Sequence, residues 1–306
     1  MKAHRTLVIG HGSIGTRHAR LLAELGTDVA VLSTRQIDHP NRYATLIDAL
    51  TSHQPGAVVI SNATATHAAS LLALAEAGFE GAVLVEKPLF DHPQTLPSLP
   101  FRHVHVAYNL RFHPLIQWLR VQLQGQPVLS VQAYAGQYLP DWRPGTDYRQ
   151  GYSAHAVQGG GVLRDLSHEL DYLGMLFGRW QRLAALGGHV SPLEIDSDDQ
   201  FGLLYQTTEC PMLTLQLNYL DRPGQRSLTI HTAAHTYVAD LRQAIIWVDG
   251  QEAYRCSVAR DDTYLTMHRA WLADGQDLCT LDEGMETLGL ISAAEKAATQ
   301  SCWIQR

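Results

Sequence analysis

The sequence predicts an α/β protein: a doubly wound parallel sheet first, followed by an α+β region with a mostly antiparallel open sheet. In the first third of the chain, short continuous apolar runs alternate with helical patterns. That alternation is typical of parallel strands covered by helices on both faces. Later runs are longer, alternate between apolar and polar residues and are joined by turn residues, which indicates consecutive antiparallel strands.

Length and composition bound the class of protein. The chain has 306 residues, enough for one large or two ordinary domains, and 45% hydrophobic residues, enough for a core. A net charge of −7 without a basic run argues against a nucleic-acid or anionic-membrane surface. We find no signal peptide and no apolar stretch that could span a bilayer. We therefore expect a cytoplasmic protein whose four scattered cysteines are reduced thiols.

The first region contains five short strand-like runs, each rich in β-branched residues and bounded by Gly, Pro or polar residues. They occupy 6–10, 28–33, 56–61, 82–87 and 103–108. Helical patterns lie between them at 13–25, 43–53 and 66–77, with a weaker one at 93–99.

The pattern changes after a helix that we predict over 109–125. A long alternating strand at 127–138 comes first, and a helix is expected over 161–177. Further strands are expected at 182–190, 200–208, 211–220, 226–233, 235–241 and 244–249, and closing helices at 263–273 and 282–299. We therefore predict two domains, 1–124 and 125–306.

The stretch LVIGHGSIGTRHARLL (7–22) contains a G-x-G-x-x-G between a strand and a helix. The motif alone is weak, but this context is that of a Rossmann dinucleotide site. Gly10 permits the tight turn, Gly12 lets the backbone approach a pyrophosphate, and Gly15 lets the helix pack on the strand. Ser13 and Ile14 would offer helix N-terminal amides to the phosphates. The alternative is a structural turn in an α/β domain that binds nothing.

The end of the second strand bears on the choice of cofactor. NAD sites commonly place a carboxylate there for the ribose 2′-hydroxyl, but this chain has Ser33, Thr34 and Arg35. Hydroxyls and a guanidinium suit the 2′-phosphate of NADP. We expect NADP, with NAD as the alternative if Arg35 is only a solvated loop residue.

Three further stretches carry a family resemblance: VVISNATATHAASLLALAEAGFEGAVLVEKPL (58–89), VAYNLRFHP (106–114) and GGGVLRDLSHELDYLGMLFG (159–178). Together with the glycine turn and the closing helix at 281–298, they make the chain resemble the glucose–fructose oxidoreductase / inositol dehydrogenase / MocA (Gfo/Idh/MocA) family. The resemblance implies an NAD(P)-binding Rossmann domain and a C-terminal domain that binds substrate and forms homo-oligomers, dimers or tetramers, through its sheet. It also implies hydride transfer between NAD(P) and a hydroxyl or ketone of a sugar.

By matching position, the resemblance makes Lys87 the catalytic lysine and Asp165 and His168 the acid/base pair. The Asp and His are three residues apart here, whereas the family usually spaces them by four; on one helix, either spacing returns to the same face. Ala63 stands where the family often has proline.

The residues support the same assignment independently. Removing a hydride from a carbinol carbon requires a group that takes the hydroxyl proton. Histidine is the natural choice for that task, and His168 is the candidate. Lys87, one of only three lysines in the chain, follows a parallel strand, where ligand sites form, and could polarise the substrate oxygen. Asp165 and Asp171 have the alternative of being helix-surface charges.

The remaining site residues follow from these motifs. We expect the dinucleotide also to contact Asn62, Ala63, Thr64, His67, Glu86, Lys87 and Asn109. We expect the substrate to contact Lys87, Arg111, Trp142, Arg143, Tyr148, Tyr152, Asp165 and His168. The loop 138–161 would wall the substrate, contact a neighbouring subunit or pack on its own domain. It resembles loops of family members that act on bacterial surface sugars, which favours a nucleotide-linked or amino sugar.

Two other functions are kept open. The chain could be a sensor that binds NAD(P) without catalysis, although such a sensor would have no need of Lys87, Asp165 and His168 together. It could also be a reductase of this fold that acts on a non-sugar substrate. We expect no metal site: His103 and His105 share a strand face, but no third ligand is adjacent.

Overall fold

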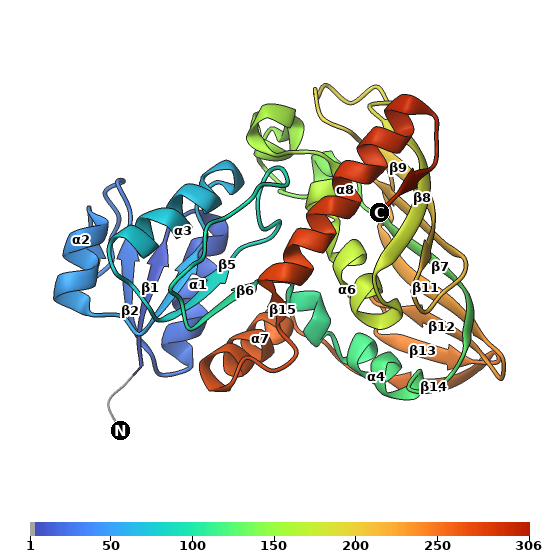
Figure 1. Ribbon diagram of the computed structural model, residues 1–306, viewed down its shortest axis with the longest axis horizontal. Helices are drawn as coiled ribbons and strands as arrows, with labels where there is room; N and C mark the ends of the chain where they lie inside the picture. The colour runs from blue at the N-terminus through green and yellow to red at the C-terminus, as the bar shows by residue number, and fades with distance from the viewer. Residues whose placement is uncertain (1–3) are drawn as a thin grey trace. The chain divides into compact units, whose positions relative to one another are not determined.

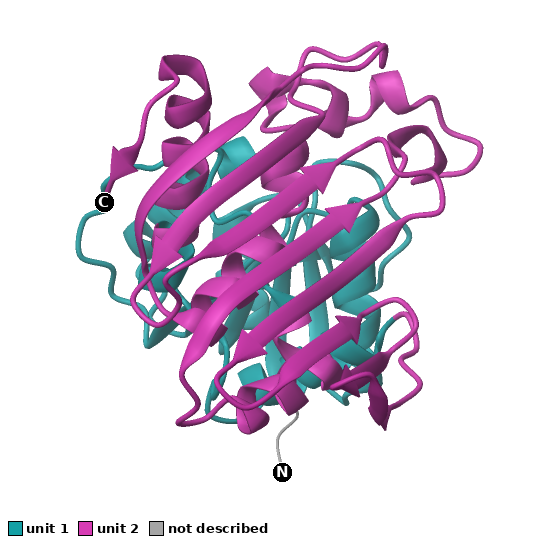
Figure 2. Cartoon of the chain, turned by 90° about the vertical axis from the view of Figure 1, so that its right-hand side faces the viewer, with its two compact units in different colours: residues 1–109, 261–285 teal, residues 110–260, 286–306 magenta. Residues whose placement is uncertain are grey.

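The computed structural model describes residues 4–306, which divide into two compact units (Figure 2). Unit 1 contains the residues up to 109 together with 261–285, and unit 2 contains 110–260 and 286–306. The chain thus leaves unit 1 after Asn109 and returns to it for a single later segment. The predicted domain boundary near residue 124 stays a prediction about the protein's domains.

Unit 1 is built on a seven-stranded sheet in the order β15-β6-β5-β4-β1-β2-β3. All neighbours are parallel except β15, an antiparallel edge strand beside β6. The strands are β1 (Arg5–Ile9), β2 (Asp28–Leu32), β3 (Arg42–Tyr43), β4 (Ala57–Ile60), β5 (Ala82–Val85), β6 (His103–Val106) and β15 (Cys279–Thr280). The predicted doubly wound sheet is confirmed, and the direction of winding reverses between β1 and β4.

The helices of unit 1 are α1 (Ser13–Glu24), α2 (Leu46–Asp48), α3 (His67–Glu76) and α7 (Asp262–Ala273) (Figure 1). α2 continues into one π-helical turn at Ala49–His53. The weak helix expected at 93–99 is wrong, because that segment has no regular structure. It contains Pro93 and Pro97, which lack the amide hydrogens that a helix interior needs.

The parallel strands of unit 1 end together. Five last residues lie side by side in the register of the sheet: Leu32, Ile9, Ile60, Val85 and Val106. The residues that follow these strands therefore emerge at one edge, which is where open α/β sheets bind ligands.

Unit 2 contains a nine-stranded sheet in the order β14-β13-β12-β11-β7-β10-β9-β8-β16, in which only the β7–β10 pair is parallel. The strands are β7 (Val128–Gly136), β8 (Trp180–Gly188), β9 (Gln200–Thr207), β10 (Leu213–Asn218), β11 (Gln225–Thr232), β12 (Thr236–Asp240), β13 (Ile245–Val248), β14 (Gln251–Arg255) and β16 (Ile304–Gln305). The expected mostly antiparallel sheet is confirmed. β14 was not anticipated, since its residues are mostly exposed and show no apolar alternation.

The helices of unit 2 lie behind the sheet in Figure 2, which leaves the other face towards the viewer. They are α4 (Pro114–Gln122), α5 (Val162–Asp165), α6 (Ser167–Phe177) and the later part of α8 (Leu281–Gln300). The single helix expected over 161–177 is wrong. The helix breaks at Leu166, whose φ of −97° and ψ of 27° separate α5 from α6.

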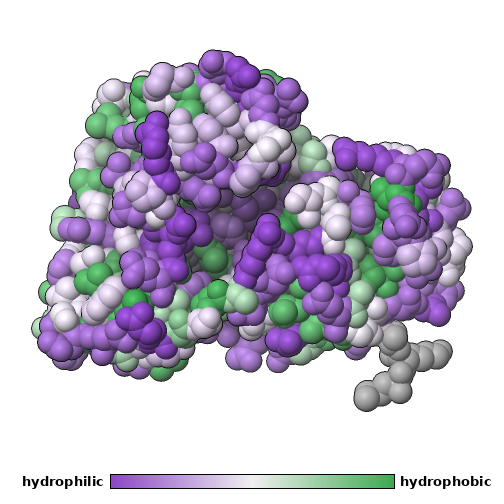
Figure 3. Space-filling view, turned by 180° about the vertical axis from the view of Figure 1, so that it is seen from behind, coloured by the Kyte–Doolittle hydropathy of each residue, from purple (hydrophilic) through white to green (hydrophobic). Residues whose placement is uncertain are grey.

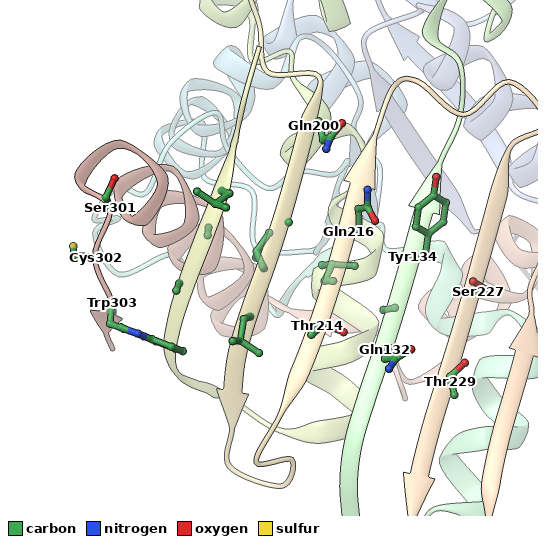
Figure 4. Close-up of a pocket in the computed structure, with 18 residues that line it drawn as sticks. Gln132, Tyr134, Gln200, Thr214, Gln216, Ser227, Thr229, Ser301, Cys302 and Trp303 are labelled. Carbon is green, nitrogen blue, oxygen red and sulfur yellow. The ribbon is translucent and has the colours of Figure 1, made fainter. Parts of the chain in front are cut away.

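The outward face of this sheet carries mostly small and polar side chains, with some apolar ones. Figure 4 shows them standing on neighbouring strands: Gln132, Tyr134, Gln200, Thr214, Gln216, Ser227 and Thr229. Beside them, Leu186 is 78% exposed and Trp303 50% exposed. The short strand β16 pairs with β8 and thereby covers that edge of the sheet.

The surface seen in Figure 3 mixes hydrophilic side chains with scattered apolar ones. Among residues 4–306, no helix is both long and apolar enough to cross a bilayer.

Two glycines of the first turn are in close contact with the backbone. A Cβ atom on Gly15 would lie 2.2 Å from the carbonyl oxygen of Gly10 and 2.8 Å from Ser61 Oγ. Gly10 has a φ of +95°, and a Cβ there would lie 2.7 Å from the amide nitrogen of Asn62. Gly12 has no atom within 4 Å of such a position. The motif therefore contains two glycines that packing requires and one that leaves space open.

We expect Gly15→Ala to lower the free energy of unfolding by about 1–3 kcal/mol, the cost of forcing atoms into a packed site. Alanine normally favours a helix interior, so this loss would come from the contacts with Gly10 and Ser61. Gly12→Ala is the matched control and should change stability by less than about 0.5 kcal/mol. Urea titration followed by fluorescence measures both. Equal stability of the two variants would contradict the close approach.

Candidate active site

The helix N-terminus after β1 is open to an anion. Gly12 is the N-cap of α1 and makes no side-chain capping bond, and the first turn holds no acidic residue. The first amides of the helix, including those of Ser13 and Ile14, are therefore available where the helix dipole favours negative charge. The space beside Gly12 lets a phosphate approach the backbone. These residues fit the pyrophosphate of a dinucleotide.

The turn after β2 carries two guanidinium groups. Ser33 Oγ accepts a hydrogen bond from the Arg35 amide at 3.2 Å, which shapes the turn, while Thr34 and Arg35 are exposed. Arg42, from the neighbouring strand β3, donates from Nε to the Arg35 carbonyl at 2.8 Å. Sequence reasoning missed Arg42, because the pairing of β3 with β2 has no local signal. Residues 33–35, directly after β2, offer positive charge and no carboxylate.

The segment after β4 is held by buried contacts. The His67 ring is 1% exposed and lies 3.1 Å from the Leu89 carbonyl through Nδ1 and 3.3 Å from the Asn62 carbonyl through Nε2. Burial lowers the pKa of His67. His67 thus ties two strand-end loops together, so its ring does not offer the cofactor contact that we expected. Ala63 is exposed and Thr64 half-buried at the start of the next helical turn.

Glu86 and Lys87 follow β5 at the same edge. Glu86 is 5% exposed; its Oε1 lies 2.8 Å from His18 Nε2, and its Oε2 accepts the Lys87 amide hydrogen at 2.9 Å. Burial acts to raise the pKa of Glu86, but the hydrogen bond and charge of His18 outweigh it, and the net shift is downward. The carboxylate is therefore ionised at neutral pH. Lys87 itself is half-buried.

Asn109 ends unit 1 just after β6. It is 5% exposed, and its Nδ2 donates to Thr263 Oγ1 on α7 at 2.6 Å. The segment 261–285 thus holds the side chain of Asn109, a residue that we expected to contact the cofactor. Neither Thr263 nor His18 was identified from the sequence; a polar residue on a buried helix face is the only signal that either one gives.

In unit 2, Arg111 and Asp171 form a buried ion pair. Arg111 is 3% exposed, and its Nε and Nη2 lie 2.8–3.1 Å from the Asp171 carboxylate oxygens. The expectation that Arg111 binds substrate is not supported, because the guanidinium is committed to this pair. Asp171 is 2% exposed and so is not a helix-surface charge.

Asp165 is held by two tyrosines. Its Oδ1 accepts from the Tyr152 hydroxyl at 2.6 Å and its Oδ2 from the Tyr219 hydroxyl at 2.7 Å. Burial and the charge of Asp165 raise the pKa of both tyrosines well above the usual range, so both remain donors. Sequence reasoning missed Tyr219, which follows β10. The arrangement suits a fixed carboxylate rather than one that moves a proton.

His168 lies on a different helix from Asp165. The break at Leu166 places Asp165 at the end of α5 and His168 in the first turn of α6. The expectation that the two residues share one helix face is therefore wrong. His168 is half-buried, whereas Asp165 is buried.

The loop between β7 and α5 packs on its own unit. Trp142 contacts the Tyr219 ring edge-on at 5.2 Å between centroids, and the Arg143 guanidinium lies 5.8 Å from the Tyr152 ring centroid. The Tyr148 hydroxyl accepts the Glu194 amide hydrogen at 3.2 Å. Trp142 and Arg143 therefore pack on the two tyrosines that hold Asp165, whereas Tyr148 contacts the backbone at Glu194.

A short acidic segment, 194–198, anchors the far side of this loop. Ser197 Oγ donates to the Ser153 carbonyl at 2.6 Å, and Asp196 Oδ1 accepts from the Ala156 amide at 2.6 Å. Asp198 Oδ2 accepts from the Leu163 amide at 3.0 Å, in the first turn of α5. Burial raises the pKa of Asp198 to about 6. These hydrogen bonds hold the loop in a defined position on unit 2.

Within residues 4–306, no group of three His, Cys, Asp or Glu side chains is arranged to hold a metal ion. His103 and His105 lie with ring centroids 5.8 Å apart on β6.

A scan of protein-family models finds no match to the chain, and no curated protein is significantly similar to it. Solved structures do share its architecture over nearly the whole length, and they define a class of fold in which a dinucleotide-binding unit is joined to an open mixed sheet.

Three of these structures illustrate the class. GenD2 from gentamicin A biosynthesis, solved with NAD, has a TM-score of 0.81 at 20% identity, covering 100% of this chain and 97% of GenD2. A levoglucosan dehydrogenase with NADH has a TM-score of 0.83 at 15% identity, covering 99% of each chain. GnnA from Acidithiobacillus ferrooxidans, a UDP-N-acetylglucosamine 3-dehydrogenase, has a TM-score of 0.76 at 20% identity, covering 98% of this chain and 99% of GnnA. At these identities the likeness establishes the fold.

We expect Tyr219→Phe to destabilise the protein by about 1.5–3 kcal/mol, the usual worth of a hydrogen bond to a charged group. Tyr205→Phe is a matched control in the same unit, because the buried Tyr205 hydroxyl has no hydrogen-bond partner among residues 4–306. Its loss should be neutral or stabilising. Urea denaturation of the two variants gives the comparison, and equal effects would argue against the Asp165 contact.

Proposed function

We propose that the protein is an NAD(P)-dependent oxidoreductase of the Gfo/Idh/MocA family that transfers a hydride between the cofactor and a hydroxyl or ketone of a sugar. The observation that carries this proposal is the open N-terminus of α1 on the same strand-end edge as Lys87. The shared fold of NAD- and NADH-bound sugar dehydrogenases supports it.

Each proposed role rests on a residue type and its place. The amides of Gly12, Ser13 and Ile14 would hold the pyrophosphate. The bound nicotinamide would accept or give the hydride. Lys87 would polarise the substrate oxygen, and His168 would take or return its proton. Convergence of Lys87 and His168 on one substrate is part of this proposal.

Asp165 has a different role in this scheme. Two tyrosine hydroxyls already occupy its oxygens, so it would supply a fixed negative charge and hold Tyr152 in place. That leaves His168 as the proton carrier.

We expect Lys87→Ala and His168→Ala each to lower kcat by about 10²–10⁴-fold, the usual contribution of a positioned proton-transfer group. Cofactor affinity should change little. Lys296→Ala on α8 is the control that removes a lysine elsewhere. Absorbance at 340 nm with a panel of nucleotide sugars and free sugars measures turnover. A variant that keeps full turnover would remove its residue from the mechanism.

We propose NADP as the preferred cofactor, because residues 33–35, directly after β2, hold no carboxylate, and Arg42 bonds to the carbonyl of Arg35 there. NADPH should therefore bind more tightly than NADH. Arg35→Ala should weaken NADPH by about 1.5–3 kcal/mol and leave NADH nearly unchanged. Arg102→Ala, an exposed arginine before β6 at the opposite edge of the sheet, is the control. Fluorescence titration decides, and equal affinity for both cofactors would overturn the preference.

We propose a nucleotide-linked or amino sugar as the substrate class. The wall formed by Trp142, Arg143 and Tyr152 presents aromatic faces and one guanidinium beside Asp165. Aromatic faces pack on sugar rings, and a guanidinium binds phosphate or carboxylate. GnnA, which shares the fold, is named for its action on a UDP-linked amino sugar.

We also propose a homo-oligomer that buries the outward face of the unit 2 sheet, where Leu186 and Trp303 are exposed. Leu186→Arg should then convert the oligomer to a monomer, since an unpaired charge would be buried at the interface. Val121→Arg on α4, which replaces another exposed apolar residue, should not. Sedimentation velocity at micromolar concentration measures both, and a monomeric wild type would exclude the assembly.

A further inference from the structure

Two histidines and a glutamate form a buried chain inside unit 1. His268 Nε2 on α7 lies 2.9 Å from His18 Nδ1 on α1, and His18 Nε2 lies 2.8 Å from Glu86 Oε1. Both histidines are 0% exposed, and Glu86 is 5% exposed. The three residues are far apart in the sequence, and nothing in the proposed hydride transfer requires two buried imidazoles. We refer to them as the His268–His18–Glu86 chain.

The protonation of this chain follows from its surroundings. The pKa of Glu86 is lowered, so the carboxylate is ionised, and His18 Nε2 must carry the hydrogen that it shares with Oε1. Burial, and the neighbouring His18, lower the pKa of His268 well below its usual value. His268 is therefore neutral. It satisfies the far nitrogen of His18 without adding a second buried charge.

The His268–His18–Glu86 chain ends at the backbone amide of Lys87. The second oxygen of Glu86 accepts the Lys87 amide hydrogen at 2.9 Å. A planar carboxylate held at both oxygens has little freedom to turn. It therefore fixes the peptide between Glu86 and Lys87, and with it the direction in which the Lys87 side chain leaves the backbone.

Further contacts next to the His268–His18–Glu86 chain hold α7 against α1. The Tyr264 ring packs edge-on against His18, with 5.7 Å between centroids, and the Arg17 guanidinium lies 5.1 Å from the Tyr264 centroid. Asp261, at the start of α7, pairs with Arg17 at 3.4 Å. The position of His268 is thus set by contacts of its own helix.

We propose that His18 and His268 are positioning residues for Lys87, acting through the Glu86 carboxylate. His268 belongs to the segment that returns to unit 1 late in the sequence, so that segment would orient the lysine of the strand-end edge. The structural part of this proposal concerns Lys87 alone. Only its effect on turnover rests on the proposed function.

The lysine content of the chain allows a direct test. Lys2, Lys87 and Lys296 are the only lysines, so reductive methylation followed by peptide mass spectrometry reports each amine separately. His268→Leu removes the contact to His18, whereas His268→Gln retains an amide near the position of Nε2. We expect Lys87 to be methylated at least threefold faster in the full-length His268→Leu protein. The rates at Lys2 and Lys296 should be unchanged, and His268→Gln should restore the wild-type rate at Lys87.

An unchanged Lys87 rate in folded His268→Leu overturns the proposal, as does a general acceleration at all three lysines. If His268→Leu does not fold, Glu86→Gln provides the same test. This substitution removes the negative charge to which His18 donates, while the side chain keeps its shape. Faster methylation at Lys87 in Glu86→Gln supports the proposal, and an unchanged rate overturns it.

Kinetics then separate this inference from the proposed function. With an active sugar substrate, His268→Leu should lower kcat about tenfold while the dissociation constant of NADPH stays within twofold, and His268→Gln should recover kcat. A methylation effect without any sugar turnover in the wild type would refute the proposed function and leave the positioning of Lys87 intact. An unchanged methylation pattern with normal wild-type turnover would do the reverse.

Discussion

The contact between the backbone of Gly10 and helix α1 is the constraint on which unit 1 depends. With no side chain at Gly15, α1 starts directly against the end of β1, and Ser61 Oγ donates to the Ile9 carbonyl beneath it. This close approach sets the helix N-terminus at the strand-end edge. It also brings His18, one turn further along α1, within reach of Glu86 at the end of β5. One packing contact thus sets both the N-terminus of α1 and the position of His18 beside Glu86.

Two buried carboxylates are stabilised in opposite ways. Glu86 is paired with an imidazole and a backbone amide, whereas Asp165 is paired with two phenol hydroxyls that stay protonated. An imidazole can carry a compensating charge, but a tyrosine hydroxyl at neutral pH donates only a hydrogen bond. Glu86 therefore has a partner that can ionise, whereas the two side-chain partners of Asp165 only donate hydrogen bonds.

Local pattern was enough to predict the sheets, the glycine turn and the place of Lys87, because apolar periodicity and turn residues act over a few positions. It failed where the decisive contact is distant. Strand pairing or a returning helix brings three residues to contacts far away in the sequence: Tyr219 to Asp165, His268 to His18, and Arg42 to the turn after β2. The helix break at Leu166 was missed for another reason: the helical pattern of the sequence runs straight through it. The mistaken helix at 93–99 is different: Pro93 and Pro97 were a local signal that was given too little weight.

The return of residues 261–285 to unit 1 determines the order in which the protein can be completed during synthesis. Strands β1 to β6 leave the ribosome early, but α7 and β15 follow only after the whole of 110–260 has been made. Until then, His18 lacks His268 and Asn109 lacks Thr263. The nascent first unit therefore lacks α7, and its strand β6 stays unpaired on one side until the later residues have been made.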